Sequence, residues 1–167
     1  MPTLIKNGQV AENTWQLVDM DAGLDNVLGT DTGEHVIVPL AMWLAEKDTL
    51  AGADKAIGVW LDSEDDPYVL AEDAATLPLI ALRFPIFRDG RPFSTAAILR
   101  ERLSFQGELR AIGDVLRDQL FYMQKCGFDS FEIGEGVSVE DAISAFADFQ
   151  TSYASTVTEP VPLFRRR

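Results

Sequence analysis

Cysteine and histidine each occur once in this 167-residue sequence, as Cys126 and His35. A single cysteine excludes an internal disulfide, a Cys-x-x-Cys redox pair and an iron–sulfur cluster held by four thiolates. A single histidine excludes the usual zinc sites that are built from several imidazoles. Since His35 has no cysteine or histidine at ligand spacing, we interpret it as structural, and Cys126 as a packing residue near a predicted helix end.

Long apolar runs and nucleotide-binding motifs are also missing. No run approaches the roughly 20 residues that cross a bilayer, and the first residues, MPTLIKNGQV, lack the apolar stretch of a secretory signal. We therefore expect a cytoplasmic protein without a membrane partner. No G-x-G-x-x-G or G-x-x-x-x-G-K-[ST] pattern occurs, so there is no Rossmann or P-loop signature. The sequence also has no motif for haem or iron–sulfur ligation, so it does not identify a cofactor.

Positive charge is scarce except in one segment. The formal net charge is −13, which disfavours nucleic acid as a partner. Residues 83–117 nevertheless hold seven of the ten arginines against four acids, for a local net charge of +3. The arginines of this segment either form surface ion pairs with neighbouring acids or bind an anionic ligand.

The length and the 47% hydrophobic content predict one domain with a substantial core. We expect a single α/β domain over residues 1–155. It comprises an N-terminal β segment with a helix over residues 1–52 and a series of βα units over residues 56–155. Residues 156–167, which hold the final three arginines, are predicted to form a flexible tail.

The N-terminal segment is predicted to contain short antiparallel strands. Leu4-Ile5 and residues 15–18 flank turn residues that include the hairpin dipeptide Asn7-Gly8. Residues 35–38 are β-branched and end at a proline. Helical spacing of apolar residues then predicts a helix over residues 40–50.

From residue 56 onward, apolar runs of strand length alternate with helical patterns. The predicted strands are residues 57–61, 79–82, 109–112 and 131–133. Predicted helices begin at Pro67, at Ser94 and Asp114 as N-caps, and at a capping box from Ser138. This alternation predicts a predominantly parallel sheet, either open or part of a β/α barrel.

Ligands of parallel sheets bind at the carboxyl ends of the strands. Of the loops at these ends, the one after residue 82 holds the most side chains that could bind a ligand. The candidate anion-binding residues are Arg83, Arg88, Arg91, Ser94 and, from the next unit, Arg117. Guanidinium groups, hydroxyls and helix N-termini are what a small oxyanion requires. The alternative is a surface loop whose arginines pair with Asp62 and Asp114.

An acidic loop, residues 62–66, follows the first strand of the series. Asp62 is a weak candidate ligand for Mg²⁺, because hard cations prefer clustered oxygens. Acidic residues before a helix also favour its dipole without any metal, and we prefer that structural interpretation. The same carboxylates would repel a flavin phosphate.

Two segments carry a family resemblance. FPIFRDGRPFS at residues 84–94 and GELRAIGDVLRDQ at residues 107–119 resemble a bacterial family of unknown function, domain family 934, closely over residues 57–133. Its members are commonly labelled oxidoreductases of sulfite reduction and are encoded beside assimilatory sulfite reductase. The resemblance implies a role in sulfur assimilation. Because sulfite reduction needs an electron-carrying cofactor, we do not expect this chain to be the reductase.

Three hypotheses follow. The first is an accessory protein of sulfite or sulfate reduction that contacts sulfite reductase, or an oxyanion, through the arginine-rich loop. The second is a small enzyme acting on a sulfur oxyanion or a phosphorylated metabolite, with Asp89 or Asp114 as general acid or base. The third is an anion-sensing regulatory module. A homo-oligomer is plausible on general grounds.

Overall fold

One curled sheet organises the chain. The computed structural model describes residues 3–30, 32–86, 89–134 and 136–146. Within these residues eight strands pair in the order β2-β1-β8-β7-β6-β5-β4-β3. The strands are β1 (Thr3–Lys6), β2 (Gln9–Ala11), β3 (Gln16–Leu17), β4 (His35–Pro39), β5 (Ala56–Leu61), β6 (Leu79–Phe84), β7 (Glu108–Gly113) and β8 (Ser130–Ile133). Strands β3 to β8 are parallel, and β1 is antiparallel to both β8 and β2.

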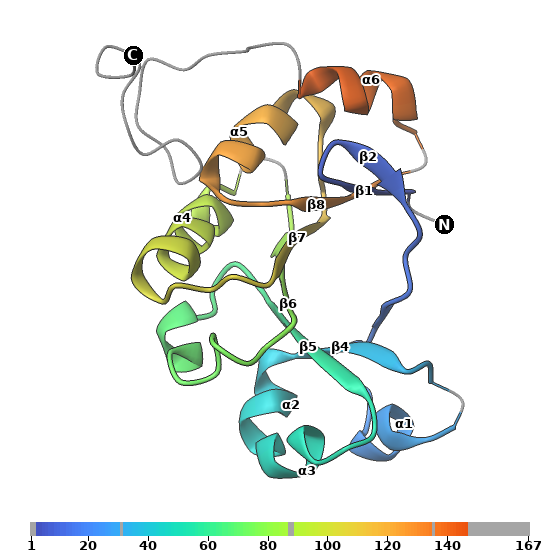
Figure 1. The fold of residues 1–167 in the computed structure, drawn as a ribbon, viewed down its shortest axis with the longest axis vertical. Helices are drawn as coiled ribbons and strands as arrows, with labels where there is room; N and C mark the ends of the chain where they lie inside the picture. The colour runs from blue at the N-terminus through green and yellow to red at the C-terminus, as the bar shows by residue number, and fades with distance from the viewer. Residues whose placement is uncertain (1–2, 31, 87–88, 135, 147–167) are drawn as a thin grey trace.

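The helices cover one face of this sheet (Figure 1). They are α1 (Leu24–Leu28), α2 (Leu40–Ala45), α3 (Lys47–Ala51), α4 (Arg91–Ala97), α5 (Leu120–Cys126) and α6 (Val139–Ala145), with 3₁₀ turns η1 (Pro67–Leu70) and η3 (Arg117–Gln119) and a π-helical turn η2 (Ile98–Arg102). Each parallel strand lies beside the next one in sequence, so successive crossovers of the same hand place their helices on the same side. The result is an open half-barrel within the α/β class that the sequence predicts.

The core lies in two layers on the two faces of the sheet. The larger layer joins the outer strand residues to the helices and runs from Ile5 in β1 to Ala145 in α6. The smaller layer lines the concave face and consists of Ile37, Trp60, Leu79, Ala81 and Ile112, with Trp15 packed against it. Strand residues alternate between the faces, which is why β5 and β6 are apolar along nearly their whole length.

The four strands predicted between residues 57 and 133 are confirmed as β5 to β8. The antiparallel pairing predicted for the N-terminal segment is only partly right. The tight turn at Asn7 (φ 53°) and Gly8 (φ 80°) returns the chain at once, so β1 pairs with β2. Strand β3, within the predicted residues 15–18, instead joins the parallel part of the sheet beside β4.

Several helices differ from their predicted extents. The helix predicted over residues 40–50 is broken at Glu46, which directs Leu50 into the core and brings the Lys47 ammonium to 2.9 Å from Asp73. The segment after Pro67 forms only a 3₁₀ turn. Gly127 ends α5 in a left-handed backbone conformation, and Ser138 caps α6 as predicted, by accepting a hydrogen bond from the Asp141 amide.

Two predicted N-caps do not cap helices. Helix α4 begins at Arg91 rather than after Ser94, because the Asp89 carboxylate already accepts the Arg91 amide at 3.0 Å. The Asp114 amide donates to the Phe84 carbonyl at 2.8 Å, so the chain stays bound to the sheet and turns helical only at Arg117.

The predicted tail, residues 156–167, and the predicted single-domain boundary at residue 155 lie outside the described residues. No helix in the described part of the chain is long and apolar enough to cross a membrane.

Candidate functional site

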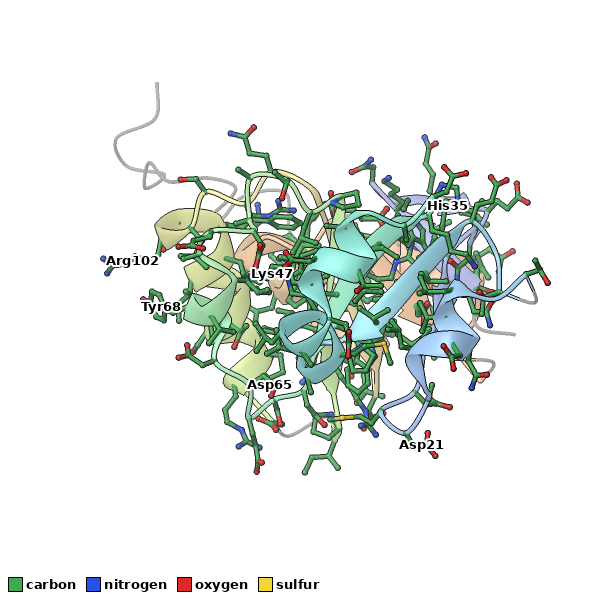
Figure 2. The ribbon with its side chains drawn as sticks, turned by 90° about the horizontal axis from the view of Figure 1, so that it is seen from below. Asp21, His35, Lys47, Asp65, Tyr68 and Arg102 are labelled. Carbon is green, nitrogen blue, oxygen red and sulfur yellow. The ribbon has the colours of Figure 1, made fainter. Side chains whose placement is uncertain are left out.

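The carboxyl ends of the parallel strands form one edge of the half-barrel. Figure 2 shows Asp21, which follows β3, and Asp65, which follows β5, together at this edge, whereas His35 at the start of β4 lies at the opposite one. We call the edge that carries Asp21 and Asp65 the carboxyl edge. The loops after β5 and β6, which carry the predicted site residues, meet there.

Arg83 lies near the end of β6 on the concave face. Its guanidinium is 3.4 Å from the Asp62 carboxylate, and the two side chains are 47% and 28% exposed. The guanidinium carbon also lies 6.0 Å from the centre of the Trp60 ring, within the range of a cation–π contact. Arg83 is therefore held by a long ion pair and an aromatic face while much of it stays open to solvent.

Arg91 is paired much more tightly. Its Nε and Nη2 groups donate to the two Asp89 oxygens at 3.0 and 2.7 Å. A further contact of 3.8 Å to Glu64 joins the loop after β6 to the acidic loop after β5. Asp89 is only 7% exposed, while Arg91 is 57% exposed. The pair fixes the loop and still leaves the outer side of the guanidinium accessible.

This pairing determines the charge state of Asp89. The hydrogen bonds from the Arg91 side chain and amide, with a smaller contribution from Ser63, hold the pKa of the Asp89 carboxyl well below its usual range. The carboxylate raises the pKa of Arg91 in turn. Asp89 stays ionised at neutral pH, so this geometry does not favour its role as a general acid.

The remaining predicted residues are spread more widely. Ser94 is exposed within α4, and Arg88 lies outside the described residues. Asp114 is half-buried just beyond β7. Arg117 contacts Ser144 of α6 at 3.4 Å and Asp118 at 3.8 Å, so it belongs to the β7–β8 side of the edge. The structure thus brings Arg83 and Arg91 to the two ends of one connection, that between β6 and α4, but does not gather the four described candidates around one point.

The carboxylates of the acidic loop accept several hydrogen bonds from backbone amides of the same segment. Asp62 accepts the Ser63 amide at 2.9 Å, and Asp65 accepts the Asp62 amide at 2.8 Å. Asp66 accepts the Tyr68 amide and so caps η1. Among the described residues, no three His, Cys, Asp or Glu side chains are arranged to hold a metal ion.

Sequence reasoning missed the roles of two other arginines of the basic segment. Arg100 donates to the carbonyls of Phe105, Gly107 and Gly127, each at 2.9 Å. Arg110 is 1% exposed on the concave face and pairs with Glu108 at 2.7 Å. Its position inside the apolar run Leu109–Ile112 was the available signal, because a charged residue there must be buried against a partner.

Comparison with known proteins places the chain in a family. A model of the family described as "Bacterial protein of unknown function (DUF934)" matches residues 58–164, which is well over half of the chain and includes every parallel strand from β6 to β8. Neither the curated proteins nor the solved structures include a significant match. The chain therefore belongs to the DUF934 family of bacterial proteins of unknown function.

Proposed function

We propose that this chain is a non-catalytic accessory protein of assimilatory sulfite reduction, which docks on sulfite reductase through its carboxyl edge. The observation that carries the docking surface is the exposure of three neighbouring side chains of one loop and strand end. Arg83 and Arg91 are 47% and 57% exposed, and Ile86 between them is 56% exposed. Arginine together with an exposed apolar side chain is typical of the centre of protein interfaces. The choice of partner rests on the sequence resemblance.

The charge pairing favours a protein partner over a free oxyanion. A small anion would have to compete with Asp62 for Arg83 and with the bidentate Asp89 for Arg91. The loop after β5, residues 62–66, holds four acidic residues, and Glu64 among them also contacts Arg91, so its charge opposes a free anion. A protein surface can accept hydrogen bonds from the outer N–H groups without displacing either carboxylate, and it gains from covering Ile86.

Binding of the purified protein to sulfite reductase tests this proposal. We expect micromolar or tighter association for the wild type, and at least a tenfold loss of affinity for Arg83→Ala and for Arg91→Ala, as expected for hot-spot arginines. Arg102→Ala is the matched control, because Arg102 is exposed and lies over the helical side of the molecule, away from Asp21 and Asp65 (Figure 2). This control should bind like the wild type.

Two results would overturn the proposal. One is no association at tens of micromolar concentration, and the other is an equal loss for Arg102→Ala, which would indicate only non-specific charge attraction. A thermal-shift series with sulfite, sulfate and phosphate distinguishes protein docking from the binding of a free anion. Stabilisation by one anion that disappears in Arg91→Ala would instead support an anion-binding enzyme or sensor.

A further inference from the structure

A buried ion-pair network lies on the concave face, away from the carboxyl edge. The Arg110 guanidinium donates to Glu108 at 2.7 Å, and Glu108 also pairs with Lys6 of β1 at 2.8 Å. On β8, Glu132 lies 3.5 Å from the other terminal nitrogen of Arg110, and its side chain is 17% exposed. The network spans three neighbouring strands, and Arg110 itself is almost completely covered.

The cover is a short segment that we call the strap, residues 12–15 between β2 and β3. In Figure 1 the chain between these strands runs along the side of the sheet opposite the helices. Asn13 of the strap is exposed, yet its side chain reaches the network. Its Oδ1 accepts from Arg110 at 2.9 Å, and its Nδ2 donates to Glu132 at 3.3 Å.

These contacts define what the network recognises. A guanidinium can only donate hydrogen bonds and a carboxylate can only accept them. Arg110 and Glu132 are therefore complementary to a group that places an acceptor and a donor side by side, as a carboxamide does. The same chemistry fixes the orientation of the Asn13 amide, since the reversed amide would satisfy neither partner.

An aromatic and apolar layer adjoins this polar network on the concave face. Ile112, two residues beyond Arg110 on the same face of β7, belongs to the concave layer with Trp60 and Ile37. Trp15 of the strap packs against that layer, and its ring centre lies 5.1 Å from that of His35. A flat apolar ring attached to an amide matches this combination.

The network also has unused hydrogen-bonding capacity. The Arg110 Nε and the Ser130 Oγ are buried without a hydrogen-bond partner, and the two residues face each other in the β7–β8 register. Buried polar atoms in native proteins are nearly always satisfied. Two such atoms on neighbouring strands leave hydrogen-bonding capacity beside the contact between Asn13 and Arg110.

We propose that Arg110 and Glu132 form a binding site for a small planar amide, which Asn13 occupies as an internal ligand while the strap is closed. An external aromatic carboxamide takes the place of the Asn13 side chain when the strap lifts. Because the Asn13 amide is tethered next to the site, it competes at high effective concentration. Its removal should strengthen the binding of an external amide.

Benzamide is the probe, and saturation-transfer NMR with a tryptophan fluorescence titration is the measurement. We expect Asn13→Ala to bind benzamide about tenfold more tightly than the wild type, the factor expected when hydrogen bonds of this kind no longer compete. Thr14→Ala, at the neighbouring exposed position of the strap, is the matched control and should behave as the wild type. Benzoate replaces the donor by a second acceptor opposite Glu132 and should bind at least tenfold less tightly than benzamide.

A second pair of variants separates binding from folding. Asn13→Ser retains a hydroxyl that can accept the Trp15 amide, which now donates to Asn13 at 3.1 Å, and should also strengthen benzamide binding. Adding Glu132→Gln to Asn13→Ala should weaken it severalfold, since a neutral amide accepts more weakly than a carboxylate. Equal benzamide affinity in the wild type and both Asn13 variants, equal binding of benzoate, or no saturable binding would overturn the proposal.

Discussion

At the scale of single residues, Asp89 is a candidate catalytic group whose carboxylate stabilises the conformation of its own loop. It is almost buried and accepts three hydrogen bonds from Arg91. We predict that Asp89→Asn lowers the free energy of unfolding by about 1 kcal/mol, a value reduced from that of a buried charged pair because Arg91 is solvated. Urea denaturation measures the change, and exposed Asp54, as Asp54→Asn, provides the control. An unchanged midpoint for Asp89→Asn would contradict the structural role.

The same carboxylate predicts a pH dependence. Its folded-state pKa is lowered by Arg91, so its stabilisation is complete above the unfolded value of about 4 and is lost as the pH falls toward the folded value. The stability difference between the wild type and Asp89→Asn should therefore shrink between about pH 5 and pH 2. Denaturation at several pH values tests this, and a difference that stays constant or grows would refute it.

At the scale of elements, the end of β7 depends on one glycine. Gly113 has φ +87°, and a Cβ added there would lie 2.4 Å from the Phe84 carbonyl oxygen of β6. We predict that Gly113→Ala costs about 2–4 kcal/mol of stability, because both the backbone conformation and the strand spacing must change. Gly134→Ala at the end of β8 is the matched control, since its Cβ would meet no atom within 4 Å. Similar melting temperatures for the two variants would contradict this account.

Arg100 joins three elements at the opposite end of the strands. It lies in the π-helical turn η2 and donates to carbonyls that precede β7 and follow α5. Arg100→Met preserves the length of the apolar stem but leaves these carbonyls without their donor, so we expect a loss of about 2–3 kcal/mol. The measurement is thermal or urea unfolding. Arg102→Met, an exposed position in the same turn, should change stability by less than about 0.5 kcal/mol.

At the scale of the whole molecule, the two core layers share one sheet and should unfold together. Trp43 lies in the helical layer, whereas Trp60 lies in the concave layer. Trp43→Phe leaves Trp15 and Trp60 as reporters of the concave layer, and the double variant Trp15→Phe/Trp60→Phe leaves only Trp43 in the helical layer. We predict that both variants show fluorescence transitions that coincide with the loss of far-UV circular dichroism. Separate transitions for the two layers would show that the concave face melts on its own.

The location of the predicted site residues in the fold could be foreseen in part, for reasons that differ between residues. The strand ends could be placed because apolar runs and turn residues mark them locally, so Arg83, Asp89 and Arg91 were assigned to the carboxyl edge. The ion-pair partners of the arginines could not be predicted, because the sequence holds 27 acidic residues that could pair with them. Spacing along the chain does not say that Asp89 turns back on Arg91 or that Arg117 reaches Ser144.

The sequence by itself determined the α/β class, the four strands from β5 to β8 and their parallel direction, because hydrophobic periodicity and the length of each crossover are local properties of the chain. Only the tertiary structure decided that β1 pairs with β8, that β3 joins the parallel strands and that the sheet curls into a half-barrel. The pairing of β1 with β8 depends on contacts between residues more than a hundred positions apart, and β3 reaches β4 only across the loop and helix α1 between them. The meeting of Asn13, Arg110 and Glu132 is of the same kind, since a buried charge finds its partner only when distant strands come together.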